Sequence, residues 1–116
     1  DALKRAVAYV EAGASGIMVH SRRKSPDEIF EFCHAFRQQD VVTPLVVVPS
    51  SFSSVTEDEF ARRGVNIVIY ANQLTRSGFP AMQRVAETIL QNGRAEEADQ
   101  FCMPIKEILT LIPEDY

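Results

Sequence analysis

Three short apolar runs alternate with stretches of helical periodicity, and this alternation limits the folds open to the chain. The runs cover residues 16–20, 45–48 and 66–70. The middle run is continuously apolar and is closed by Pro49, which is typical of a strand covered on both faces. Strands joined by helical crossovers lie parallel in one sheet. The sequence therefore predicts an α/β fold with a parallel sheet.

Helix signals surround these strands. Apolar residues at helical spacing stop at Gly13, a residue suited to a helix C-terminus. Ser25 and Glu28 match a capping box, which would open a helix to about residue 38 with Ile29, Cys33 and Phe36 on its buried stripe. A second box, from Thr56 to Glu59, would open a short helix that ends at Gly64.

The last third of the chain is predicted to be helical. Residues 71–80 fit either a loop or a kinked helix start, because Pro80 interrupts helical hydrogen bonding. A clear helix then runs from about Met82 to Gln91, and Pro104 opens a last short helix. We expect one partial domain over residues 1–116, with a terminal helical tail from about residue 94.

Three parallel strands alone would leave two unpaired apolar edges. Such a sheet needs further strands from upstream or cover from a partner chain. The chain begins with Asp1, inside or just before a helix. We therefore interpret it as a piece of a longer polypeptide, the C-terminal portion of a TIM-type (β/α)8 barrel with about three strand–helix units.

Composition argues against several classes of protein. A net charge of −4 does not suit a general nucleic-acid binder, which would carry a basic face. No apolar run approaches the roughly 20 residues that span a bilayer, so no membrane partner is expected. Cys33 and Cys102 belong to no CxxC or zinc-type spacing. We expect two reduced thiols and a cytoplasmic location.

Residues 20–24 supply the sharpest candidate site. His20 ends the first strand and is followed by Ser21 and three cations, beginning with Arg22. Ligands of parallel α/β proteins collect at the carboxyl ends of strands, where a histidine can donate a hydrogen bond near neutral pH and cations favour an anion. The alternatives are a histidine bonded to a neighbouring loop, a turn serine and a solvated basic loop.

Other polar residues carry weaker signals. Asn72 follows the third strand and would either contact a substrate or cap the next helix. His34 and Cys33 are neighbours on one helix and do not share a face, so no metal or nucleophile pair follows. Helix-start chemistry explains the carboxylates at 57–59. No metal ligands are predicted within this chain.

Segments over nearly the whole chain resemble the C-terminal part of the phosphoenolpyruvate phosphomutase family, in the isocitrate lyase/phosphoenolpyruvate mutase superfamily. The segments are Asp1-Ala-Leu-Lys-Arg-Ala6, Ala12-Gly-Ala-Ser-Gly-Ile-Met-Val-His-Ser21, Val46-Val-Val-Pro49, Val68-Ile-Tyr-Ala-Asn72 and Pro104-Ile-Lys-Glu-Ile108. Two departures stand out. Arg22 and Arg23 stand where a lysine pair, or a lysine with a variable residue, is expected, and residues 50–52 read Ser-Ser-Phe instead of a Thr-Lys-Tyr type segment.

The resemblance implies strands six to eight of the barrel and a Mg²⁺-dependent isomerisation of phosphoenolpyruvate and phosphonopyruvate. It matches His20 to the family's substrate-contacting histidine, which would stabilise the phosphoryl group in transit as a catalytic residue. Together with the candidates from the strand ends, we expect substrate binding by His20, Ser21, Arg22 and Asn72. The Mg²⁺ carboxylates, a gating loop and a substrate arginine would lie upstream, so the isolated fragment is expected to be inactive.

The resemblance also implies a homo-oligomer in which the last barrel helix, about residues 82–91, is exchanged between subunits. Two alternatives to the mutase remain open. One is phosphonopyruvate hydrolase, which would release pyruvate and phosphate from the same site. The other is a non-catalytic barrel or dimerisation fragment.

Overall fold

The computed structural model describes residues 1–112 and divides the chain into two compact units. The first, Asp1–Ala71, contains every strand and is called the sheet unit here. The second, Asn72–Tyr116, is called the helical unit and is described to Ile112. The end of the predicted tail, residues 113–116, lies outside the described residues. That both units belong to one partial domain stays a prediction.

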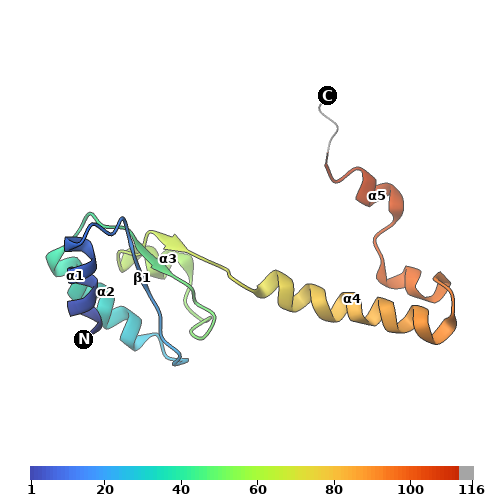
Figure 1. The fold of residues 1–116 in the computed structure, drawn as a ribbon, viewed down its shortest axis with the longest axis horizontal. Coiled ribbons are helices and arrows are strands. Elements are labelled where there is room, and N and C mark those ends of the chain that lie inside the picture. Colours follow the sequence, from blue (N-terminus) through green and yellow to red (C-terminus); the bar gives the residue numbers. More distant parts are fainter. Residues whose placement is uncertain (113–116) are drawn as a thin grey trace. The chain divides into compact units, whose positions relative to one another are not determined.

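The sheet unit contains three parallel strands in the order β1-β2-β3. They are β1 (Ile17–Val19), β2 (Leu45–Val47) and β3 (Ile67–Val68). Helices α1 (Ala2–Glu11), α2 (Asp27–Gln39) and α3 (Glu57–Arg62) precede the strands in turn (Figure 1). The prediction of a parallel α/β sheet is confirmed.

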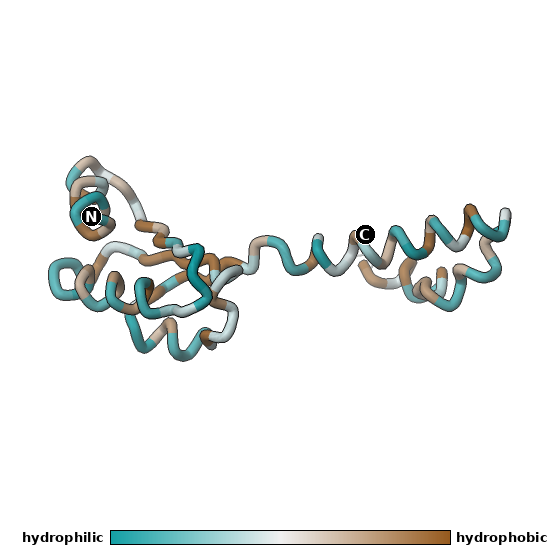
Figure 2. The backbone as a smooth tube through the Cα atoms, turned by 90° about the horizontal axis from the view of Figure 1, so that it is seen from below, coloured by the Kyte–Doolittle hydropathy of each residue, from teal (hydrophilic) through white to brown (hydrophobic). Residues whose placement is uncertain are grey.

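Helices cover one face of this sheet. The buried cluster draws on all three helices and on alternate strand positions, as in Ile17, Leu45 and Val47. Figure 2 shows apolar strand segments running through the middle of the sheet unit. The register places Met18 and Ile67 on the opposite face, where they are 59% and 48% exposed. A barrel has this arrangement, with helices outside the sheet and side chains filling the interior.

The helical unit contains α4 (Gln73–Asn92), the 3₁₀ helix η1 (Glu96–Phe101) and α5 (Ile105–Leu109). Helix α4 begins at Gln73 and includes Pro80, so the helical alternative for residues 71–80 is correct from Gln73 on. Segment η1 lies beside α4 (Figure 1). Among residues 72–112, Ala98 is the only buried side chain. None of the helices within residues 1–112 is long and apolar enough for a membrane crossing.

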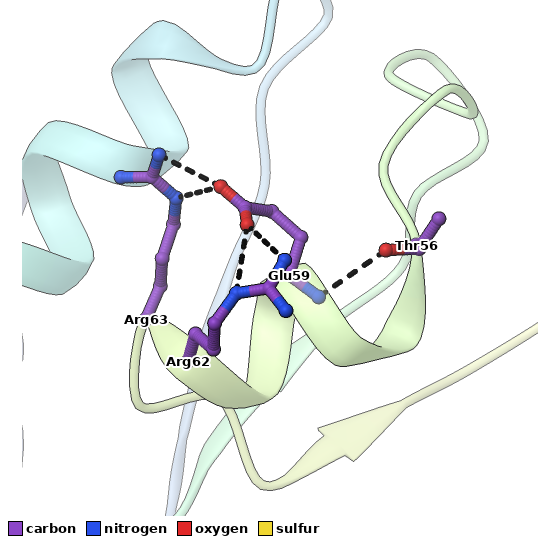
Figure 3. A network of polar contacts seen from close by, with 4 residues as sticks. All are labelled: Thr56, Glu59, Arg62 and Arg63. Carbon is purple, nitrogen blue, oxygen red and sulfur yellow. Dashed lines mark hydrogen bonds and ion pairs between the residues drawn. The ribbon is translucent and has the colours of Figure 1, made fainter.

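The two predicted capping boxes differ in outcome. Thr56 caps α3, because its Oγ1 accepts a hydrogen bond from the Glu59 N–H at 3.2 Å (Figure 3). The box at Ser25 and Glu28 does not form, since Pro26 occupies the N-cap position of α2 without a side-chain bond. The carboxylate of Glu28 instead accepts a bond from Ser21, which satisfies it more directly than a helix N–H would.

One arginine ties the amino-terminal ends of the strands together. Arg37 donates hydrogen bonds to four oxygens, which are the carbonyls of Asp40, Thr43 and Gly64 and the side-chain Oδ1 of Asn66. Gly64 has a φ of +87°, and a Cβ there would lie 2.8 Å from Arg37 Nε. Glycine at position 64 therefore meets both a backbone requirement and a space requirement.

We predict that Gly64→Ala destabilises the full-length protein more than Gly13→Ala does. Gly13 has a φ of +98° but no atom within 4 Å of its ideal Cβ. Gly13→Ala should lower the free energy of unfolding by about 1 kcal/mol, from backbone strain alone. Gly64→Ala should lower it by about 2–4 kcal/mol, because the new methyl also displaces Arg37. Equal losses in urea denaturation would contradict the role given to Arg37.

Candidate functional site

His20 lies directly after β1, exposed at the carboxyl end of the sheet. Its ring centroid is 6.2 Å from that of Phe52, with 47° between the planes. Phe52 is fully buried and packs edge-on against Phe60, so its ring is held in the core. His20 also borders an open cleft of about 320 Å³, with Arg5 and Tyr9 of α1 and Met18 of β1 among the lining residues. The imidazole is thus accessible on one side and supported on the other.

Ser21 fastens the loop that carries His20. It is 7% exposed, and its Oγ donates a hydrogen bond to Glu28 Oε2 at 2.8 Å. The same oxygen accepts a hydrogen bond from the Arg23 N–H at 3.1 Å. Glu28 also forms an ion pair with the Arg23 side chain at 3.1 Å. The hydroxyl proton of Ser21 is therefore committed to Glu28, and a substrate could use this group only as an acceptor.

The cations after β1 are not equivalent. Glu28 holds the guanidinium of Arg23, whereas Arg22 and Lys24 are exposed and form no hydrogen bond or ion pair with residues 1–112. Arg22 directly follows the anchored Ser21 and is separated from His20 by that one residue. His20, Arg22 and Lys24 are consequently the groups in this loop that remain open to an anionic ligand.

Asn72 occupies the N-cap position of α4, but its side chain makes no cap bond. Its Oδ1 accepts a hydrogen bond from Arg76 Nη1 at 3.3 Å, and its main-chain N–H donates to Gln73 Oε1 at 3.2 Å. It belongs to the helical unit, whereas His20 belongs to the sheet unit. The meeting of these two residues at one site stays a prediction.

The residues of this chain do not fit a Mg²⁺ site. Within residues 1–112, no three His, Cys, Asp or Glu side chains are grouped so that they could hold a metal ion. The carboxylates at residues 57–59 are close together in sequence, but two of them have other partners. Glu57 accepts a hydrogen bond from the Tyr70 hydroxyl at 2.6 Å, and Glu59 pairs with two arginines.

The two thiols form no pair. Cys33 and Cys102 are both free, the first buried and the second exposed. Burial raises the pKa of the Cys33 thiol, although the nearby charges of Arg37 and Arg63 partly oppose the shift. A neutral thiol inside the core is a poor nucleophile, so Cys33 acts as a packing residue.

Sequence reasoning missed two supporting residues of this loop. Glu28 was assigned to a helix cap, although it binds Ser21 seven positions earlier. Phe52 was noted only as a departure from the family pattern, whereas its ring lies against His20 and Phe60. Phe52 lies in the serine-rich loop between β2 and α3. Its large apolar side chain was the one signal in the sequence that this second loop is anchored in the core.

Comparisons with known proteins give consistent matches. The family model for phosphoenolpyruvate phosphomutase matches residues 1–90. A phosphonopyruvate hydrolase from a Variovorax species is 38% identical over 112 residues, which are 96% of this chain and 38% of the hydrolase. The phosphoenolpyruvate phosphomutase of Tetrahymena pyriformis is 36% identical over 115 residues, 99% of this chain and 37% of that protein.

Solved structures agree with these matches. A phosphoenolpyruvate phosphomutase from Streptomyces platensis superposes with a TM-score of 0.81 at 30% identity, covering 92% of this chain and 36% of that one. A phosphonopyruvate hydrolase superposes with a TM-score of 0.78 at 38% identity, covering 92% and 37%. The chain thus spans a little over a third of the length of these relatives. The predicted resemblance and the predicted partial barrel are both confirmed.

We predict that Ser21→Ala loosens the loop that carries His20. Loss of a buried hydroxyl that bonds Glu28 should lower the free energy of unfolding of the full-length protein by about 1–2 kcal/mol. Lys24→Ala is the matched control, because Lys24 lies in the same loop, is exposed and forms no hydrogen bond or ion pair with residues 1–112. The control should stay within about 0.5 kcal/mol of wild type in urea denaturation. If both variants lose the same amount, the Ser21–Glu28 bond does not hold the loop.

Proposed function

Since the chain belongs to the phosphoenolpyruvate phosphomutase family, we propose that the full-length protein is an enzyme that interconverts phosphoenolpyruvate and phosphonopyruvate. In this isomerisation the phosphorus–oxygen bond of phosphoenolpyruvate breaks and a phosphorus–carbon bond forms at the methylene carbon. Matches to phosphomutases over 97–99% of the chain support the proposal. A cytoplasmic location is part of the same proposal.

The observation that carries the proposal is the placement of His20. Its imidazole is exposed at the carboxyl end of β1, backed by a fixed Phe52 ring, and Arg22 is exposed two positions later. In this role His20 donates a hydrogen bond to a phosphoryl oxygen and stabilises charge while the phosphoryl group moves. Arg22 adds positive charge beside the same group. Phosphoryl transfer depends mainly on positioning and electrostatic stabilisation, so no covalent bond to His20 is required.

Ser21 and Asn72 complete the proposed substrate-binding set. Ser21 would act mainly by holding the loop through Glu28, since its proton is already donated. Asn72 would present its amide to the substrate from the start of α4.

We propose that Mg²⁺ binds to carboxylates outside this segment and supplies positive charge to the substrate. A phosphonopyruvate hydrolase that superposes with a TM-score of 0.77 is known in complex with oxalate and Mg²⁺.

Phosphonopyruvate hydrolysis is the second candidate. A hydrolase matches this chain at 38% identity, as closely as the phosphomutases do. In that reaction water would attack phosphorus, the carbon–phosphorus bond would break, and pyruvate and phosphate would leave. The Ser-Ser-Phe segment at residues 50–52 differs from the mutase-type pattern and leaves both reactions open.

The helical unit is proposed to mediate assembly. Helix α4 has no buried residue within the chain, and Leu74, Phe79 and Met82 are 88%, 64% and 67% exposed. So much apolar surface on one helix is typical of an interface. We propose a homo-oligomer in which the stretch at about residues 82–91 packs against a second subunit. Assembly without catalysis is the remaining alternative.

We predict that the full-length protein converts phosphonopyruvate to phosphoenolpyruvate in the presence of Mg²⁺, followed by phosphorus NMR. His20→Ala should lower kcat by about 10²–10³-fold, the typical cost of removing a donor that stabilises transition-state charge. Ser25→Ala, in the same loop but not at the site, should keep wild-type kcat. Appearance of free phosphate instead would favour the hydrolase. No turnover by a folded protein, or an unchanged rate in His20→Ala, would contradict the proposed site.

We predict that Met82→Glu weakens association of the full-length protein. A charge placed on the apolar face of α4 would have to be desolvated at the interface, which should raise the dissociation constant at least about tenfold. Ser77→Glu adds the same charge to an exposed polar position of this helix outside residues 82–91 and should leave association unchanged. Sedimentation equilibrium measures both. A monomeric wild-type protein, or equal effects of the two variants, would contradict the interface.

A further inference from the structure

A second cleft of the sheet unit lies between α2 and the turn from α3 to β3. It measures about 320 Å³ and is lined by Phe30, His34, Arg37, Gln38, Arg62, Arg63 and Gly64. Three of these side chains are arginines, and none is an acid. Sequence reasoning attached no role to this group of residues.

Two of the arginines are held in place by one carboxylate (Figure 3). Glu59 Oε2 accepts hydrogen bonds from Arg62 Nε at 3.2 Å and Nη2 at 2.7 Å. Glu59 Oε1 accepts from Arg63 Nε at 2.9 Å and pairs with its Nη2 at 2.8 Å. Hydrogen bonds from the two guanidiniums hold the pKa of Glu59 below its usual range, so it stays ionised. The arrangement fixes both guanidiniums before any ligand arrives.

An aromatic ring fixes the second guanidinium further. The Arg63 Cζ lies 3.5 Å from the ring centroid of Phe30, which is a close cation–π contact. Its side chain is 39% exposed and that of Arg62 is 68% exposed, so both remain accessible.

Hydrogen-bonding capacity remains on these two side chains. Arg62 and Arg63 each use Nε and Nη2 for Glu59, and Nη1 of each makes no hydrogen bond to residues 1–112. Arg37 differs, because its Nε, Nη1 and Nη2 all bond to protein oxygens. Arg37 therefore adds charge to the cleft, whereas Arg62 and Arg63 offer donors as well.

The cleft is positively charged although the chain as a whole is negatively charged. The chain carries a net charge of −4, yet Arg62 and Arg63 share a single carboxylate, Glu59, and Arg37 adds a third positive charge close to Asp40, so the cleft keeps an excess of one positive charge. Concave surfaces of one sign concentrate the local field and attract ions of the opposite sign. Guanidinium groups pair especially well with phosphate oxygens, through two parallel N–H bonds.

This cleft is separate from the His20 loop. Gly64 precedes β3 and Arg37 bonds the carbonyl of Thr43 just before β2, so both mark the amino-terminal ends of the strands. His20 follows the carboxyl end of β1. Because the strands are parallel, these are opposite ends of the sheet. The cleft cannot be part of the substrate site proposed above.

We propose that the cleft between α2 and α3 is a binding site for a phosphate-bearing anion, held by Arg62 and Arg63. The phosphate oxygens accept hydrogen bonds from the free Nη1 groups, with Arg37 contributing charge from behind. The volume exceeds that of one phosphate group, so a small phosphate monoester also fits. The proposal does not depend on the reaction catalysed at the other end of the sheet.

The test is a titration of the full-length protein with inorganic phosphate, followed through the arginine Nε–H signals in NMR. Signals of Arg62 and Arg63, assigned by their Gln variants, should shift and saturate. A chloride titration at matched ionic strength should not reproduce these shifts. Glycerol 3-phosphate is the second probe, and tighter binding than phosphate would identify a monoester as the ligand class.

Variants test whether phosphate binds through Arg62 and Arg63. Arg63→Gln should weaken phosphate binding about tenfold, as judged by the signal of Arg62. Arg62→Gln serves if Arg63→Gln does not fold, since Arg62 is more exposed and makes no ring contact. Arg94→Gln is the matched control, because it also removes one charge from an arginine–glutamate pair, and it should leave binding unchanged. Shifts that chloride reproduces, shifts that do not saturate, or equal weakening by Arg94→Gln would overturn the proposal.

Discussion

Burial of one face of a short parallel sheet is the constraint on which the rest of the structure depends. The strands are only two or three residues long, so they contribute few ladder bonds and must gain stability from packing. Ile29, Cys33 and Phe36 of α2 supply much of that packing over Leu45 and Val47, all of them essentially inaccessible to solvent. This packing fixes the positions of the strands, and therefore the positions of the loops at their two ends.

The two ends of the sheet consequently have different properties. At the carboxyl ends, the loop after β1 is anchored by Ser21 and Glu28 and leaves His20 and Arg22 exposed. At the amino-terminal ends, Arg37 donates hydrogen bonds to three carbonyls, two in the connection from α2 to β2 and one in the turn before β3, and so fixes the backbone. Reactive groups on one end and structural bonds on the other are usual for barrels of this kind. The proposed anion cleft adds a ligand site at the amino-terminal ends of the strands.

Unburied apolar surface is consistent with a chain that spans only part of its relatives' length. Met18 and Ile67 on the open face of the sheet have no cover within the sheet unit. In a closed barrel the same face is filled by side chains from the other strands. Helix α4 likewise has no buried residue of its own. Both surfaces call for further polypeptide, which agrees with a chain that spans a little over a third of the relatives' length.

The sequence by itself determined the order of the elements, the parallel sheet, the buried stripe of α2 and the position of His20 at a strand end. These properties follow from local periodicity and from residues that start or stop helices, and both signals depend only on residues close together in the sequence. Only the tertiary structure decided the partners of the polar side chains. Glu28 binds Ser21 in place of a helix cap, Arg37 reaches Gly64 across 27 positions, and Phe52 lies against His20. Such contacts join residues that are distant in sequence, so they depend on how the elements pack, which no local pattern encodes.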